Sequence, residues 1–180
     1  MKEKFVYQAP SNGYPEWNNN PEITHINALP ARATMVAYDT EEEAKALNRD
    51  ASKRKVSLNG MWKFNFATNP ANAPADFYKT DYSVSDWDDI KVPANWQTEG
   101  YDYPQYTNTR YPWSEAEPKL RPPYAPEGYN PVGSYVTTFT PSDWDGVSPV
   151  SIHFAGVESC YYLWVNGDFV GFSKDTFSPH

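Results

Sequence analysis

The chain is poor in the residues that build disulfide, zinc and membrane proteins. It has one cysteine, Cys160, so no disulfide forms within it, and its three histidines lack the spacing of a zinc site. No apolar run reaches the roughly 18 residues that a transmembrane helix needs, and the first residues lack the apolar core of a signal peptide. These absences predict a soluble chain with no metal site of its own.

Basic residues are also scarce. The chain has 15 lysines and arginines against 23 acidic residues, which gives a net charge of −8. Binding to nucleic acid or to an anionic membrane surface requires a basic face, so neither is expected as a partner. A neutral substrate suits this surface better than an acidic polymer.

Aromatic residues and prolines are plentiful by contrast. Aromatic residues make up 17% of the chain, including seven tryptophans and fourteen tyrosines, and there are seventeen prolines. Many rings separated by proline-rich turns favour an all-β domain over a helical one. Aromatic faces also stack well on sugars, although most of these rings are expected to lie in the core.

The first 38 residues are rich in Asn, Pro and Ala and follow no periodic pattern. Such a segment buries too little apolar area to fold by itself, so it is expected to be an extended arm that lies on another surface. Residues 39–50 predict a short helix, because Thr40 and Glu43 have the spacing of a capping box and acidic residues fill the first turn.

A strand pattern begins after residue 55. Trp62, Phe64 and Phe66 alternate within residues 56–67 and are expected on one face. Further strands are expected at residues 90–92, 132–140 and 150–154, and on both sides of Asn166-Gly167, a dipeptide typical of a type I′ hairpin turn.

About six strands without a helical period or repeats predict an antiparallel β-sandwich of the jelly-roll type. A jelly roll has about eight strands, so residues 56–180 are expected to form an incomplete domain, truncated at its C-terminal end. Residues 1–55 form the arm with its short helix, and we interpret them as an interface or assembly segment.

One long irregular segment, residues 93–131, interrupts the strand pattern. Irregular segments of this length in compact domains are usually functional or disordered. Trp96, Trp113 and several tyrosines lie within it and favour an ordered, functional loop.

Five blocks of the sequence occur in an order that is familiar from one enzyme family. They are WNNNPEITHINALPARA at 17–33, SLNGMWKF at 57–64, VPANWQTEGYDYPQYTNTRYPW at 92–113, PPYAP and NPVGSY within 122–135, and FAGVESCYYLWVNGDFVGFSKD at 154–175. Together these blocks resemble the N-terminal part of the β-galactosidases of glycoside hydrolase family 2.

The resemblance implies a galactose-binding-like jelly roll that serves as the sugar-binding domain of a retaining β-galactosidase. In that family both catalytic glutamates lie on a separate TIM barrel, and the acid/base follows an asparagine; this chain has no Asn-Glu dipeptide. We therefore expect no catalytic residue here and no activity from the chain alone. Its acidic residues lie in predicted surface segments and form no obvious pair: Glu41, Glu42, Glu43, Asp86, Asp88, Asp89, Glu115 and Glu117.

The resemblance also implies substrate-binding residues in the long loop. Asn108, after Tyr106 and Thr107, corresponds to the asparagine that reaches the bound galactose, and an amide both donates to and accepts from hydroxyls. Thr109 corresponds to the next residue lining the site. Without a sugar role, Asn108 would be a turn residue bonded to its own backbone. We interpret Trp62 as a core residue.

The complete enzyme is expected to bind magnesium and sodium, whereas this chain is expected to hold no cofactor. The resemblance implies a lactose-like β-galactoside, the remaining domains of the enzyme and further copies in a homo-oligomer as partners. The cytoplasm is favoured over the periplasm, although the compartment stays open. Two alternatives remain: a free-standing carbohydrate-binding module and a purely structural assembly segment.

Overall fold

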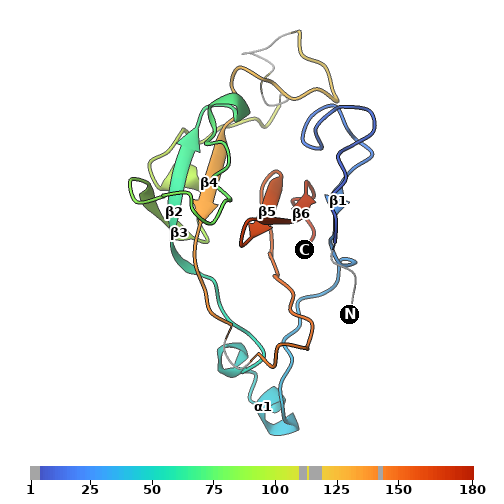
Figure 1. The fold of residues 1–180 in the computed structure, drawn as a ribbon, viewed down its shortest axis with the longest axis vertical. Helices are drawn as coiled ribbons and strands as arrows, with labels where there is room; N and C mark the ends of the chain where they lie inside the picture. Colours follow the sequence, from blue (N-terminus) through green and yellow to red (C-terminus); the bar gives the residue numbers. More distant parts are fainter. Residues whose placement is uncertain (1–4, 110–112, 114–118, 142–143) are drawn as a thin grey trace.

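The computed structural model describes residues 5–109, 113, 119–141 and 144–180. In this part of the chain six strands form two three-stranded sheets, which lie side by side in Figure 1. The strand orders are β3–β2–β4 and β1–β6–β5, and every pairing is antiparallel. The described helices are short, so the predicted all-β class is confirmed.

The first sheet is built around β2 (Gly60–Ala67). This strand pairs with β3 (Asp88–Val92) on one side and with β4 (Val132–Val136) on the other. Phe64 of β2 and Ile90 of β3 are almost fully buried and form the centre of this half of the core. The three strands agree with the sequence prediction, except that β2 begins at residue 60, β3 begins at residue 88 and β4 ends at residue 136.

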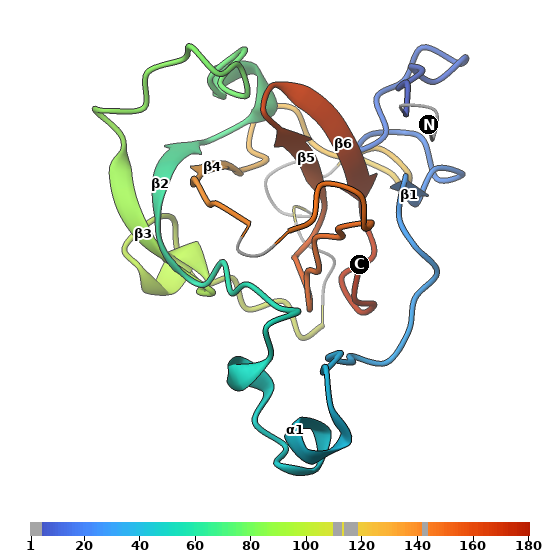
Figure 2. The ribbon, with the colours of Figure 1, turned by 60° about the horizontal axis from the view of Figure 1, so that its bottom comes forward.

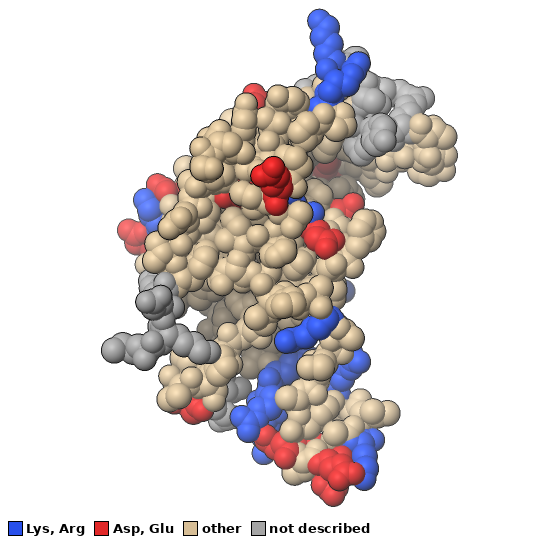
Figure 3. All heavy atoms as spheres, turned by 90° about the vertical axis from the view of Figure 1, so that its right-hand side faces the viewer, with Lys and Arg blue, Asp and Glu red and all other residues tan. Residues whose placement is uncertain are grey.

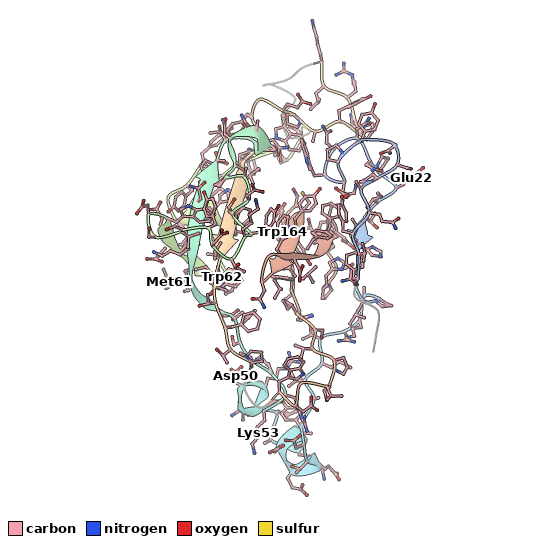
Figure 4. All side chains as sticks on the ribbon, in the orientation of Figure 1. Glu22, Asp50, Lys53, Met61, Trp62 and Trp164 are labelled. Atoms are coloured by element: carbon pink, nitrogen blue, oxygen red, sulfur yellow. The ribbon has the colours of Figure 1, made fainter. Side chains whose placement is uncertain are left out.

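The alternation predicted for β2 is confirmed for two of its three rings. Phe64 and Phe66 both contact the ring of Trp96, so they share one face of the sheet. Trp62 is only half-buried, and its Nε1 donates a hydrogen bond to the backbone oxygen of Leu58 at 2.8 Å. This tryptophan therefore lies at the border of the core rather than inside it; Figure 4 labels it on β2.

The second sheet contains the predicted hairpin, formed by β5 (Tyr161–Val165) and β6 (Asp168–Ser173). Asn166 and Gly167 join the strands with φ angles of 53° and 86°. Positive φ at both central residues defines a type I′ turn, whose twist matches that of the strands, so this prediction is confirmed.

The third strand of this sheet comes from the arm. β1 (His25–Ile26) pairs with β6 and lies beside it in Figure 2. A Cβ on Gly171 would lie 3.0 Å from the backbone oxygen of Ile26, so a glycine at this position permits the close approach. The sequence did not indicate this strand, because two residues are too few to show a period of two.

The predicted helix is shorter than expected but is capped as predicted. α1 (Glu41–Lys45) begins after Thr40, which accepts a hydrogen bond from the backbone of Glu43, and the Glu43 side chain completes the capping box. Leu47 has a φ of 54°, a left-handed conformation that ends the helix, and a 3-10 turn follows at Arg49–Ala51.

Charged side chains of both signs gather at the end of the molecule that carries α1 (Figure 3). Three exposed ion pairs lie there: Lys45 with Glu41, Arg54 with Asp39, and Lys55 with Asp50. No helix among the described residues is long and apolar enough to cross a membrane.

Two further 3-10 turns lie in the connecting segments. Pro70–Asn72 lies between β2 and β3 and is capped by the side chain of Asn69. Trp96–Thr98 follows β3 and begins the long loop.

The strand predicted at residues 150–154 is wrong. The structure assigns no strand there; instead Phe154 exchanges two backbone hydrogen bonds with His180, at 2.6 and 2.9 Å. The alternating sequence resembles a strand, but these residues have no ladder partner among the described residues beyond that single pair.

Candidate functional site

The long loop, residues 93–131, begins on the buried face of the first sheet. Trp96 packs on Phe64 and Phe66, with ring centroids 6.3 and 5.9 Å away. Gly133 of β4 makes room for these rings, because a Cβ there would lie 2.7 Å from Phe64 and 2.8 Å from Trp96. The start of the loop is therefore held by core packing.

Tyr101 provides a second anchor for the start of the loop. Its ring meets Phe64 edge to face at 4.7 Å, and its hydroxyl donates a hydrogen bond to Asp88 Oδ2 at 2.8 Å. Burial, and then the hydrogen bond to the Asp88 carboxylate, raise the pKa of Tyr101. The phenol therefore stays protonated and keeps its donor role at neutral pH.

The returning end of the loop is tied to both the first sheet and the outgoing end. Asn130 N–H donates to Thr68 O at 2.9 Å. Tyr129 donates from its hydroxyl to the Asp102 carboxylate, and its ring stacks on Tyr103 with 6.4 Å between centroids. Burial, followed by the contact with Asp102, raises the pKa of Tyr129. These contacts close the base of the loop.

The predicted substrate-binding residues lie on this closed loop and face solvent. Asn108 and Thr109 are exposed, and Tyr106 is 86% exposed. Within the described part of the chain, the Asn108 side chain forms no hydrogen bond. An exposed amide two residues after an exposed ring provides the donors, the acceptor and the flat face that a neutral sugar needs.

Asp86, Asp88 and Asp89, on and just before β3, are bonded to neighbouring side chains. Asp88 accepts the hydrogen bond from Tyr101, Asp89 forms an ion pair with Lys63 at 3.0 Å, and Asp86 accepts from Ser85. Glu41, Glu42 and Glu43 occupy the first turn of α1. Glu115 and Glu117 lie outside the described residues.

The family resemblance implies magnesium and sodium for the complete enzyme. Among the described residues, no three His, Cys, Asp or Glu side chains lie together as an ion would require. The donors in this part of the chain therefore do not fit a carboxylate- or histidine-based metal site.

Sequence analysis missed an aromatic cleft beside the hairpin. It has a volume of about 460 Å³, and its walls include Tyr7, Tyr78, Tyr162, Trp164 and Phe169. Tyr78 stacks on Trp164 with 5.1 Å between centroids and 12° between planes. Because the rings pack on one another across three distant segments, we interpret the cleft as packing of the arm and a loop on the sheet.

Comparison with known proteins gives the family. The family described as "Glycosyl hydrolases family 2, sugar binding domain" matches residues 55–180, which contain the long loop and all the strands except β1. The chain belongs to glycosyl hydrolase family 2. The resemblance inferred from the five sequence blocks is therefore confirmed.

Several β-galactosidases are similar to this family 2 chain. That of Priestia megaterium (strain DSM 319 / IMG 1521) is 54% identical over 98% of the chain and 17% of its own length. That of Halalkalibacterium halodurans is 45% identical, over 91% of the chain and 16% of its length. The β-galactosidase large subunit of Leuconostoc lactis is 39% identical, over 91% of the chain and 27% of its own length. The chain thus spans only 16% to 27% of these curated relatives.

Proposed function

We propose that this chain is the N-terminal, sugar-binding part of a retaining β-galactosidase that hydrolyses terminal β-D-galactosides such as lactose. The observation that carries the proposal is the long loop: its two ends are fixed, and Asn108 between them has an exposed amide that bonds to no residue in the described part of the loop. The names of the similar proteins and the family match support it.

In this proposal the chain binds and orients the sugar, and the catalytic carboxylates come from another domain. Retention needs two carboxyl groups about 5–5.5 Å apart across the scissile bond. Asn108 hydrogen-bonds to galactose hydroxyls, and Thr109 lines the site next to it. Because the chain holds the sugar next to the carboxylates that the other domain supplies, it lowers the entropic part of the activation barrier.

A free-standing carbohydrate-binding module is the second candidate function. It is favoured by the exposed ring of Tyr106, two residues before Asn108, on which a pyranose can stack. Titration of the isolated chain with galactose and lactose, followed by tryptophan fluorescence, distinguishes the two. Saturable binding near millimolar or tighter favours the module, whereas a folded chain that does not respond favours a site shared between domains.

We also propose the finer architecture that the family implies. The two sheets belong to a jelly roll, residues 56–180 form its sugar-binding domain, and residues 1–55 form an arm that serves assembly. The enzyme is a cytoplasmic homo-oligomer that takes magnesium and sodium through residues of its other parts.

The direct test is an assay of the complete enzyme with this chain at its N-terminus. We expect hydrolysis of lactose, with β-galactose as the first product observed by proton NMR, because double displacement retains the anomeric configuration. Release of α-galactose, or turnover of β-glucuronides or β-mannosides in preference to β-galactosides, would contradict the proposal.

A further inference from the structure

A short part of the arm lies between the hairpin and the returning end of the long loop. We name this contact region the arm junction; it consists of Glu16, Asn18 and Asn20 of the arm with Ala125, Tyr162 and Lys174. Glu16 and Asn20 are only 3% and 4% exposed, although they belong to a segment with almost no regular structure. Polar side chains so deeply buried require partners.

The hairpin side of the arm junction supplies a partner for the Glu16 carboxylate and for two backbone oxygens of the arm, whereas the Asn20 side chain donates to Asn12 Oδ1 within the arm at 3.5 Å. Tyr162 donates from its hydroxyl to Glu16 Oε2 at 2.9 Å, and Tyr7 of the arm donates to the other carboxylate oxygen. Lys174, just after β6, donates from Nζ to the backbone oxygens of Glu16 at 2.9 Å and of Asn20. A buried carboxylate with two phenol donors and a neighbouring ammonium fixes the arm on the second sheet.

The other side of the arm junction contacts the long loop. The backbone N–H of Ala125 donates to Asn18 Oδ1 at 2.9 Å, across 107 residues of sequence. The next residue, Pro126, is almost completely buried. The returning end of the loop is therefore fixed to the arm at this point as well as to the first sheet.

The covalent chain and one set of contacts across the loop link Ala125 to the part of the loop that carries Asn108. Three residues beyond Pro126, Tyr129 bonds to Asp102 and stacks on Tyr103. Asp102 and Tyr103 in turn precede Asn108 by only five or six residues. Displacement of residue 125 would thus change the placement of the base from which Asn108 projects.

We propose that Asn18 is a positioning residue for the galactoside reaction, which acts through Ala125 and the Tyr129–Asp102 contact on the placement of Asn108. The inference rests on the function proposed above. It gives the arm a role inside its own chain, in addition to the assembly role.

The test uses the complete enzyme and the variant Asn18→Ala, which removes the acceptor for Ala125. We expect KM for lactose to rise about 3-fold to 10-fold, the range of one lost hydrogen bond, while kcat changes less. A variant that only folded less well would contain less active enzyme, so its apparent kcat would fall while its KM stayed unchanged. Asn18→Asp keeps an acceptor oxygen and should restore KM.

Asn12→Ala provides the matched control. Asn12 lies in the same arm, and among the described residues its Oδ1 accepts hydrogen bonds from Tyr14 and Asn20 of the arm but from neither the hairpin nor the long loop. The KM of the Asn12→Ala enzyme for lactose should stay within about 2-fold of that of the parent enzyme. A rise equal to that of Asn18→Ala would overturn the inference, since the arm as a whole and not the Asn18 contact would be responsible.

The same substitution in an Asn108→Ala background separates this inference from the proposed function. If Asn18 acts through Asn108, the KM effect of Asn18→Ala largely disappears in that background. If Asn18→Ala raises KM as much in the Asn108→Ala background as in the parent enzyme, the inference is overturned. The inference is also overturned if Asn18→Ala leaves KM unchanged while Asn108→Ala lowers kcat/KM. The proposed sugar contact of Asn108 survives both results. An Asn108→Ala enzyme with unchanged kinetics overturns the sugar contact and this inference together.

Discussion

The indole ring of Trp96 meets the ring of Phe66 edge to face, with 5.9 Å between the ring centroids and 77° between the ring planes. Phe66 belongs to β2 and Trp96 to the first turn of the long loop, so this contact joins a regular strand to the irregular segment that carries Asn108. The loop is therefore positioned by the packing of the core, and substitutions in the core are expected to affect it.

Substitution of Trp96 tests how the start of the loop is anchored. Trp96→Ala should lower the free energy of unfolding by about 3 kcal/mol, through lost ring contacts and the space left behind. Trp96→Phe should cost only about 1 kcal/mol, because the buried Nε1 has no hydrogen-bond partner among the described residues and a phenyl ring keeps most contacts. Urea unfolding of the parent chain and both variants measures these losses of stability. Equal losses for the two variants would contradict the prediction.

Gly133→Ala is expected to disturb the same contact from the side of β4. The added Cβ would lie 2.7–2.8 Å from the rings of Phe64, Trp96 and Tyr135, so the rings must move, at a cost of about 1–3 kcal/mol. Gly156→Ala is the control, since its Cβ would have only an ordinary contact of 3.6 Å with Thr176 O. Thermal unfolding in which both variants matched the parent chain would disprove the crowding.

Stability should fall in alkaline solution because the core contains buried phenols. Burial raises the pKa of Tyr135 to about 12, whereas a phenol in the unfolded chain titrates near 10. Below about pH 10 both states hold the proton and the stabilisation is complete. Between about pH 10 and 12 the phenol loses its proton in the unfolded state but keeps it in the folded state, so the free energy of unfolding declines as pH rises. For this group the decline is less than about 1.4 kcal/mol per pH unit.

Urea unfolding between about pH 9 and pH 11.5 measures this decline, with Tyr135→Phe as the control variant. The variant lacks the ionisable hydroxyl, so its stability should fall less steeply than that of the parent chain. Identical slopes would show that Tyr135 does not contribute.

The sugar contact of Asn108 has its own kinetic signature. In the complete enzyme, Asn108→Ala should reduce kcat/KM by an amount equivalent to about 1–3 kcal/mol, as expected for a lost polar contact with substrate. Gln105→Ala removes another exposed amide of the same loop and should leave kcat/KM unchanged. If both variants retained full activity, Asn108 would lie outside the site.

Signals confined to a few neighbouring residues were the ones that sequence analysis interpreted correctly. The Asn166-Gly167 turn and the Thr40–Glu43 capping box depend on local backbone chemistry, and both are present. The alternation at 150–154 also looked local, but a strand needs a hydrogen-bonded neighbour, which the sequence does not specify. The sugar role of Asn108 and Thr109 stays a prediction.

The sequence by itself determined the all-β class, the hairpin, the capped helix and the family, because each depends on short patterns or on ordered blocks of residues. Only the tertiary structure decided that β1 joins β6, that Trp96 lies on Phe66, and that Asn18 accepts a hydrogen bond from Ala125. These contacts join residues that lie far apart along the chain. Their energies depend on which surfaces meet when the chain folds, and no local pattern encodes that meeting.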